Sequence, residues 1–358
     1  MPDNDMISTL LTGINKRVKA IGADVPAFRL SDNVSDFVVE RIPTGNPKID
    51  GLMHGGAPKG RIIEVFGPES SGKTTLILTI IAGAIRKNPN CCVLFIDSEN
   101  ALDLDYARRI GMKTENVIVQ QPDYGEQCLE LVKQACLEKI ENKALANQEI
   151  IIAVDSVAAL VPKSEFEESQ IGDSGGMARQ AQMMSMAMRQ LVRPINESNC
   201  CALFTNQVRD NVGSPYSVAS TPGGRALKFY SSIRLQTAKL GKWESGEGIK
   251  AKLTVVKSKL FPPFKSVEFH IGSSGIDSWM DLLEDGIKSG ILDKKGASIS
   301  YGTQKLGVGF MNAKEFLKSN TEIAQKLVNE LATTPAKSSK IEVEVIDDVE
   351  DAKELLSA

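Results

Sequence analysis

A glycine-rich segment that ends in lysine and threonine carries the clearest chemistry in this sequence. Residues 67–74 read Gly-Pro-Glu-Ser-Ser-Gly-Lys-Thr and match the phosphate-binding pattern G-x-x-x-x-G-K-[ST]. In such a loop, backbone N–H groups and a helix N-terminus surround a phosphate, and Lys73 adds a full positive charge. Residues 61–66 are typical of a buried strand, and residues 75–86 of an apolar helix. This context favours a site for ATP or GTP over a chance glycine-rich turn.

An aspartate ends a second apolar run and is a candidate metal ligand. Asp155 closes the strand-like residues 149–155. In P-loop NTPases a carboxylate at this place supports Mg²⁺, while the loop hydroxyl, here Thr74, coordinates it directly. A strand-end aspartate can also cap a helix. The phosphate loop makes the metal role the favoured interpretation.

Two further strand ends carry polar side chains at the edge where parallel sheets bind ligands. Glu99 follows the apolar residues 91–97 and is our candidate for orienting and deprotonating the attacking water, with Asp97 as a competitor in a structural role. Gln207 ends the run 200–207 and precedes a long polar loop. Its amide can bond a γ-phosphate and lose that contact afterwards, so the sequence predicts a switch here.

Composition indicates an ordinary soluble chain. It has 358 residues, a net charge of −3 and 42% hydrophobic residues, with no apolar run near the roughly 20 residues of a membrane helix. The start of the sequence lacks the pattern of a signal peptide, so we expect a cytoplasmic protein. The six cysteines form no C-x-x-C pair, which favours buried thiols over a zinc site. Acidic residues gather after position 341, which leaves the remainder slightly basic.

Strand-like and helical patterns alternate after the phosphate loop. We expect helices at 102–110, 125–141 and 176–197, between strands at 91–97, 117–120, 149–155 and 200–206. This order predicts an α/β fold, with a mainly parallel sheet covered by helices on both faces. Successive strands at 233–237, 250–256 and 266–271 predict an antiparallel extension. Residues 278–319 indicate a small α-rich domain, with helices at 279–289 and 313–319, and we expect disorder after residue 333.

The first residues form an amphipathic pattern. Apolar side chains recur at helical spacing between about residues 6 and 21, with lysine and arginine between them. Such a helix can dock on its own domain or pack on a neighbouring subunit. The sequence leaves both open.

Seven segments together resemble one family, the bacterial RecA recombinases. They are Gly67–Thr75, Phe95–Asp103, Gln121–Gln127, Val154–Pro162, Ile171–Ser174, Gly223–Tyr230 and Val255–Lys259. They occur in the family's order and cover roughly residues 40 to 330. We predict a RecA-type P-loop core, with boundaries at 1–38 for an oligomerisation arm, 39–271 for the ATPase core, 272–332 for a small C-terminal α/β domain and 333–358 for a disordered acidic tail.

The resemblance implies an ATP-dependent enzyme that forms a helical filament on single-stranded DNA, pairs it with a homologous duplex and exchanges strands. ATP and Mg²⁺ would be its cofactors, and Glu99, Lys73, Gln207, Lys257 and Lys259 its catalytic residues. Lys257 and Lys259 would reach the ATP of the adjacent subunit from one face of a strand. Nucleotide contacts would come from Gly67, Pro68, Glu69, Ser70, Ser71, Gly72, Lys73, Thr74, Thr75, Asp103 and Tyr106.

The resemblance also implies two DNA loops, at about 165–177 and 208–224. Candidate DNA contacts in and around them are Met177, Arg179, Ser185, Arg189, Arg209, Val212, Tyr216, Gly223, Gly224 and Arg225. Lys239, Lys250 and Lys252 are candidates for a second site that holds the incoming duplex. The sequence departs from the expected pattern in its acidic first loop and in Asp210 and Asn211, as a divergent or phage-borne member of the family would.

Two other functions share such a core. One is a hexameric helicase or RecA-like repair ATPase, although the zinc module or large extra domain typical of those is not visible in the sequence. The other is an ATP-gated regulatory filament without strand exchange. Only the sparse positive charge of the DNA loops supports that alternative.

Overall fold

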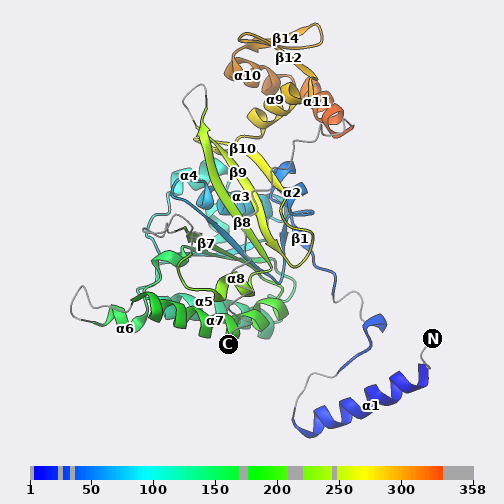
Figure 1. Ribbon diagram of the computed structural model, residues 1–358, viewed down its shortest axis with the longest axis vertical. Helices are drawn as coiled ribbons and strands as arrows, with labels where there is room; N and C mark the ends of the chain where they lie inside the picture. Colours follow the sequence, from blue (N-terminus) through cyan, green and yellow to red (C-terminus); the bar gives the residue numbers. More distant parts are fainter. Residues whose placement is uncertain are drawn as a thin grey trace, which may run out of the picture. The chain divides into compact units, whose positions relative to one another are not determined.

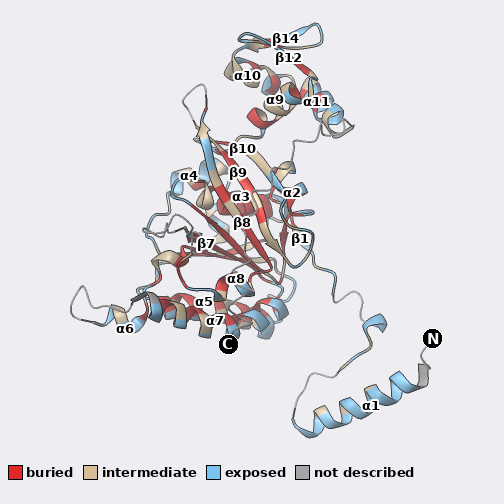
Figure 2. Cartoon of the chain, in the orientation of Figure 1, coloured by how far each residue is buried: buried red, intermediate tan, exposed pale blue. Residues whose placement is uncertain are grey.

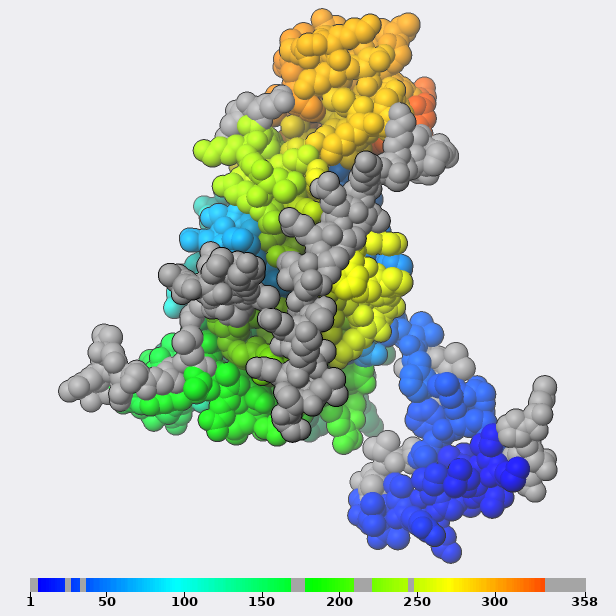
Figure 3. Space-filling view, viewed as in Figure 1, coloured from blue at the N-terminus to red at the C-terminus, as the bar shows by residue number. Residues whose placement is uncertain are grey.

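The computed structural model describes residues 4–22, 27–32, 37–168, 176–208, 221–243 and 248–333. The chain divides into two compact units, Met1–Glu40 and Arg41–Ala358. Figure 1 shows the elements of each unit, and Figure 3 shows one face of the molecule in space-filling form. No helix in these ranges combines the length and apolar character needed to cross a bilayer.

The first unit contains helix α1 (Asn4–Ala20), as the amphipathic pattern predicted, and the short 3-10 turn η1 (Leu30–Asp32). The Asn15 side chain fastens the following segment, because it donates to the carbonyl of Ala27 at 2.9 Å and accepts from its N–H at 2.7 Å. Met6 and Leu10 are nevertheless about two-thirds exposed (65% and 64%), and Figure 2 shows the helix as largely exposed. The described residues of this unit therefore leave the apolar stripe largely exposed.

The second unit is built on one large sheet. Among the described residues nine strands pair in the order β11-β10-β9-β8-β3-β7-β6-β4-β5. The strands from β8 to β5 in this order run parallel, and β9, β10 and β11 join antiparallel. Their bounds are β3 (Ile62–Gly67), β4 (Cys92–Asp97), β5 (Val117–Gln120), β6 (Ile150–Asp155), β7 (Cys201–Gln207), β8 (Ile233–Lys242), β9 (Ile249–Ser258), β10 (Ser266–Gly272) and β11 (Gly275–Ile276). The predicted α/β core with an antiparallel extension is confirmed.

Helices cover both faces of this sheet. One face carries α3 (Lys73–Lys87) and α4 (Leu104–Ile110), packed on Ile63, Val65 and their neighbours. The other carries α5 (Gly125–Glu141), α7 (Gly176–Glu197) and α8 (Ala226–Tyr230), packed on Ile62, Phe204 and their neighbours. Short elements complete this part of the unit: β1 (Arg41–Ile42), α2 (Pro47–Leu52), β2 (Ala57–Pro58), η3 (Thr114–Asn116), η4 (Val157–Ala159) and α6 (Lys163–Phe166).

The C-terminal part has a core of its own, centred on Leu283, Ile299, Leu317 and Leu327. It comprises α9 (Ser278–Ser289), β12 (Leu292–Lys295), β13 (Ser298–Tyr301), β14 (Gln304–Val308), α10 (Phe310–Ser319) and α11 (Thr321–Thr333). The antiparallel sheet β12–β13–β14 and helix α11 were not predicted as elements from the sequence. These strands are short and mostly polar, so they lack a clear alternating pattern.

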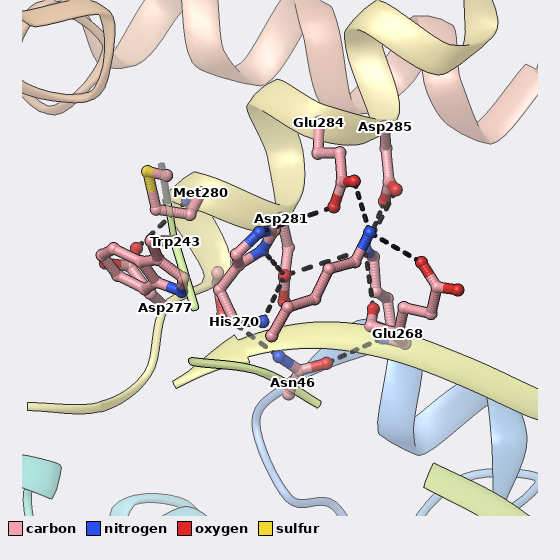
Figure 4. Close-up of polar contacts among 12 residues, drawn as sticks. Asn46, Trp243, Glu268, His270, Asp277, Met280, Asp281, Glu284 and Asp285 are labelled. Atoms are coloured by element: carbon pink, nitrogen blue, oxygen red, sulfur yellow. Dashed lines mark hydrogen bonds and ion pairs between the residues drawn. The ribbon is translucent and has the colours of Figure 1, made fainter. Parts of the chain in front are cut away.

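Helix α9 is tied to the large sheet through buried polar contacts (Figure 4). Asp281 Oδ1 accepts from both the backbone N–H and the Nδ1 of His270 on β10, each at 2.9 Å. Lys250 Nζ of β9 lies 2.6 Å from Glu284 and 2.8 Å from Glu268. These contacts join β9, β10 and α9.

Candidate nucleotide site

The phosphate loop follows β3 and leads directly into α3. Gly72 caps the helix with a φ of 93°, and Ser70 also has a positive φ of 55°, so the chain curls tightly here. Lys73 Nζ donates to the carbonyls of Gly67 (3.1 Å) and Pro68 (2.8 Å), which holds its ammonium within the curl. Burial lowers its pKa, while the nearby carboxylate of Asp155 opposes that shift.

The antiparallel extension braces this loop. A Cβ on Gly67 would lie 2.3 Å from the carbonyl oxygen of Thr237 on β8, and one on Gly72 would lie 2.4 Å from Ile271 Cδ1 on β10. Ser71 Oγ donates to the Pro68 carbonyl at 2.7 Å and lies 2.7 Å from Thr237 Oγ1. A side chain at Gly67 would meet backbone, and one at Gly72 would be strained by the positive φ. The loop's shape therefore depends on both glycines and on strands more than 160 residues away in sequence.

Thr74 and Asp155 meet as expected for a metal pair. Thr74 Oγ1 donates to Asp155 Oδ2 at 2.7 Å, and the hydroxyl of Thr205 donates to Asp155 Oδ1. Burial raises the pKa of Asp155, which a bound cation would counter. A hydroxyl and a carboxylate beside a phosphate loop are the oxygen donors that Mg²⁺ prefers, so these residues fit the ion.

Glu99 and Gln207 also come together, although 108 residues separate them. Gln207 Nε2 donates to Glu99 Oε1 at 3.1 Å, and the Ser156 hydroxyl donates to the same oxygen. Asp97 instead accepts from the N–H groups of Ala101 and Leu102, both at 3.1 Å. These bonds match the structural role that the sequence suggested for Asp97 as the alternative to a catalytic one. The carboxylate of Glu99, after β4, and the amide of Gln207, at the end of β7, thus lie side by side, and Ser156 after β6 also contacts the carboxylate.

The two residues predicted to hold adenine lie at the start of α4, Asp103 as its N-cap and Tyr106 within it. Asp103 caps the helix by accepting from the N–H of Tyr106 at 2.9 Å. The Tyr106 hydroxyl lies 2.8 Å from Thr75 Oγ1, so its ring stands beside the start of α3. Burial raises the pKa of Tyr106.

Lys257 lies far from the phosphate loop of its own chain. It pairs in register with Arg234 on β8, which pairs with Glu64 on β3, three residues before Gly67. At about 3.3 Å per residue and 4.8 Å per strand, the backbones of Lys257 and Gly67 are roughly 14 Å apart. Paired residues share a sheet face, and this face is the one opposite α3.

The lysine environment is strongly positive. Lys257 Nζ donates to the carbonyls of Lys228 (2.6 Å) and Phe229 (2.9 Å). Burial, reinforced by Lys259 and Arg234, lowers its pKa to about 8. Lys259 is exposed and lies one residue beyond the end of β9, and its N–H donates to the Ser232 carbonyl at 2.8 Å. The expectation that both lysines share a strand face stays a prediction. The Ser258 side chain ends the strand by accepting from the N–H groups of residues 260 and 261.

The predicted DNA contacts are placed unevenly. Arg189 is exposed on α7 and donates to the carbonyl of Ser185 at 3.2 Å, whereas Arg179 pairs with Glu168. Gly224 and Arg225 are exposed before α8, and Gly223 is buried against Met184. Arg209, Val212 and Tyr216 lie outside the described residues, as does the side chain of Met177.

The second predicted DNA surface is also divided. Lys239 is exposed and Lys252 half-exposed, and their register places them on opposite faces of the β8–β9 pair. The third candidate, Lys250, is engaged by Glu268 and Glu284.

Comparison with known proteins gives one consistent result. The RecA N-terminal domain matches residues 7–277, and the RecA C-terminal domain matches residues 280–334. The chain is 43% identical to Protein RecA of Brucella anthropi over 84% of its length and 81% of that protein. It is also 45% identical to Protein RecA of Clostridium tetani over 86% of its length and 87% of that protein. This chain belongs to the RecA family. The predicted resemblance is confirmed.

RecA-family membership confirms the predicted activity, an ATP-dependent recombinase with DNA-dependent ATP hydrolysis. It favours this function over the helicase and the regulatory filament. Sequence reasoning missed a buried polar chain in this RecA-family core: Arg234 Nε donates to Glu64 at 2.5 Å, and Asn206 Nδ2 donates to Glu64 at 3.1 Å. The signal was available, because Glu64 interrupts an otherwise apolar strand and a buried charge requires a partner.

Proposed function

We propose that this chain assembles into a helical filament on single-stranded DNA, aligns it with a homologous duplex and exchanges strands, with ATP hydrolysed between subunits. The main support for hydrolysis between subunits is the distance between Lys257 and the phosphate loop of the same chain. A lysine side chain cannot cover the distance on its own chain, yet Lys257 and Lys259 form a cationic end of the sheet. Phosphates of a neighbouring subunit's ATP would match that charge.

The remaining residues supply the other half of the site. Lys73 and the loop N–H groups would hold the β- and γ-phosphates. Thr74 and Asp155 would hold Mg²⁺, which supplies charge neutralisation at the transferred phosphate. Glu99 would orient the attacking water and accept its proton, and Gln207 would bond the γ-phosphate.

The Glu99–Gln207 contact supports the proposed switch. While Gln207 bonds Glu99, its amide is directed to the catalytic carboxylate. A γ-phosphate would offer a charged acceptor to the same amide, and charge-assisted bonds are the stronger ones. Gln207 also ends β7, immediately before the loop proposed to bind DNA. Gln207 would therefore couple the bound nucleotide to DNA binding.

Adenine would lie against Tyr106 with its amino group at Asp103. The DNA strand would follow exposed groups near α7 and α8, chiefly Arg189, Gly224 and Arg225. The uncovered apolar stripe of α1 favours a neighbouring subunit as its partner. We place this activity in the cytoplasm, where DNA and ATP are available.

One experiment tests the proposal. ATP hydrolysis is measured with and without single-stranded DNA, and the products are imaged, with Glu99→Gln as the control that retains the loop. We expect strong stimulation by DNA and helical filaments, with hydrolysis lost in Glu99→Gln. Hydrolysis or assembly that is indifferent to DNA would contradict the proposal, and closed rings on DNA would favour a helicase.

A further inference from the structure

Glu99, the proposed general base, lies on the turn after β4 and is exposed. A long carboxylate side chain at the surface moves readily between rotamers. A general base must nevertheless keep one oxygen within roughly 2.6–3.2 Å of the group whose proton it removes. The contacts that restrict this side chain therefore decide how well it can act.

Two neutral donors hold one oxygen of this carboxylate. The Ser156 hydroxyl and the Gln207 amide both donate to Oε1 of Glu99, the amide at 3.1 Å. Within the part of the chain that the structure describes, no hydrogen bond engages Oε2. The carboxylate is thus anchored through Oε1, and Oε2 is the oxygen that can accept the proton of a water molecule.

The Ser156 side chain is not used where a serine at its position is normally used. Ser156 is the N-cap residue of η4, yet its side chain makes no capping hydrogen bond. Serine is favoured at this position because its hydroxyl usually accepts from the N–H groups of the following turn. Ser156 is only 1% exposed, and a buried hydroxyl requires a partner. The partner that it has is the carboxylate of Glu99.

The turn that carries Glu99 is tied to the segment that carries Ser156. Ser98 Oγ donates to the carbonyl of Ser156 at 2.8 Å, and the Ser98 N–H donates to the carbonyl of Asp155 at 2.9 Å. These two bonds join the backbones on either side of the contact between Ser156 and Glu99. The position of the hydroxyl relative to the carboxylate is therefore fixed by backbone as well as by side chains.

We propose that Ser156 is a positioning residue, which holds Glu99 in place while ATP is bound. The inference rests on the proposed function, because it takes Glu99 as the general base. In the proposed switch, the Gln207 amide turns to the γ-phosphate and releases Oε1. The Ser156 hydroxyl is then the donor that remains, and its bond to a charged acceptor is of the stronger kind. Ser156 thus holds the carboxylate at the step in which Glu99 acts.

The test compares Ser156→Ala with a matched loss of another buried serine hydroxyl in the full-length chain. The control is Ser198→Ala, because Ser198 is also buried and donates to the carbonyl of Ile195 at 3.2 Å, just before the other end of β7. In Ser156→Ala, kcat for DNA-stimulated hydrolysis should fall by about 10- to 100-fold, the scale of one hydrogen bond to a charged group. The KM for ATP should change less than about twofold, because the bond does not bind ATP itself. Ser198→Ala should leave both values unchanged.

Two further variants separate positioning from a general structural effect. Ser156→Cys keeps the size of the buried side chain but supplies only a weak donor, so kcat should again fall while the KM for ATP and the thermal unfolding midpoint stay unchanged. Glu99→Ala removes the carboxylate, so single-turnover hydrolysis by Glu99→Ala/Ser156→Ala should equal that by Glu99→Ala alone. Residues that act through one another show such non-additivity, whereas independent effects multiply.

Three results would overturn the inference. The first is an unchanged kcat in Ser156→Ala or Ser156→Cys. The second is a fall in kcat that is accompanied by an equal loss of ATP affinity. The third is a further loss when Ser156→Ala is added to Glu99→Ala. Full hydrolysis by Glu99→Ala, or absence of DNA stimulation in the unmodified chain, would instead refute the proposed function itself.

Discussion

Removal of the Lys257 side chain gives the sharpest test of a site shared between subunits. Lys257→Ala deletes an ammonium that lies roughly 14 Å, by strand spacing, from the phosphate loop of its own chain. Loss of one preorganised donor at a reacting centre typically lowers kcat by about 10²–10³. We therefore expect DNA-stimulated hydrolysis to fall by about that factor. Nucleotide affinity of the isolated subunit should change less than about twofold, because no bound phosphate touches this lysine there.

A mixing experiment makes the assignment decisive. Glu99→Gln should be defective in the half of the site that carries the phosphate loop, whereas Lys257→Ala should be defective in the half that the neighbouring subunit contributes. A complete site then forms wherever the loop of Lys257→Ala meets Lys257 of Glu99→Gln. Random assembly of equal amounts makes about one quarter of head-to-tail interfaces complete, so hydrolysis should recover to roughly a quarter of the unmodified rate. Lys305→Ala, an exposed lysine of β14, is the control and should behave as the unmodified chain.

Two results would refute this reasoning. Mixtures that remain inactive would show that Lys257 and Glu99 act within one chain. A Lys257→Ala monomer that loses nucleotide affinity as Lys73→Ala does would show the same.

The lowered pKa of Lys257 adds a pH dependence to the same test. In the free subunit this pKa is about 8, and the phosphate of a neighbour's ATP would raise it. Assembly then takes up a proton, so ATP-dependent assembly should weaken as the pH rises above about 8. Light scattering across this range measures the effect. Lys257→Arg, which keeps its charge, should flatten the profile, and an equally steep profile in that variant would contradict this account.

Three further changes test other parts of the structure. Gly72→Ala places a Cβ 2.4 Å from Ile271 Cδ1 at a φ of 93°, so urea denaturation should show that the free energy of unfolding falls by about 1–3 kcal/mol. Gly13→Ala is the control, because no atom lies within 4 Å of its new Cβ, and it should show no such fall. Thr74→Val removes a hydroxyl but keeps the shape of the side chain, so the Mg²⁺ concentration for half-maximal hydrolysis should rise at least tenfold. Thr79→Val is the control and should leave this concentration unchanged. An unchanged concentration in Thr74→Val would exclude Thr74 as a ligand. Hydrogen bonds from Lys250 of β9 and Lys288 of α9 lower the pKa of Glu268 below its usual 4.5. These contacts therefore stabilise the α9 junction above that pH and are lost as the pH falls through the lowered pKa. Fluorescence of Trp243 and Trp279 should report that loss, and Glu268→Gln should remove the transition.

The sequence predicted the elements that depend on local pattern. Helices α5 and α7 begin and end at the expected residues, because their apolar spacing is regular over four or more turns. The phosphate loop and the strand ends at Asp97, Asp155 and Gln207 were equally accessible, since parallel strands bring their carboxyl ends to one edge.

Long-range contacts could not be predicted in the same way. The contact of Ser71 with Thr237 joins residues 166 positions apart, and that of Glu64 with Arg234 joins residues 170 apart. Glu64 in an apolar strand indicates that a partner is needed, but the sequence does not identify the partner in either pair, because that depends on which strands become neighbours in the sheet. The strands of the C-terminal part were missed because their shared core, rather than their own pattern, holds them in place.

The hydrogen bonds of Glu64 have a consequence for the geometry of an assembly. Through Asn206 and Arg234 this one carboxylate connects β7, which ends in Gln207, with β8, which pairs with Lys257. In the proposed filament, Gln207 and Lys257 of one subunit face two successive ATP molecules. The spacing between those molecules is then set within each subunit by the adjacent, hydrogen-bonded strands β7, β3, β8 and β9. Changes in filament pitch would have to occur between subunits, at the ATP itself.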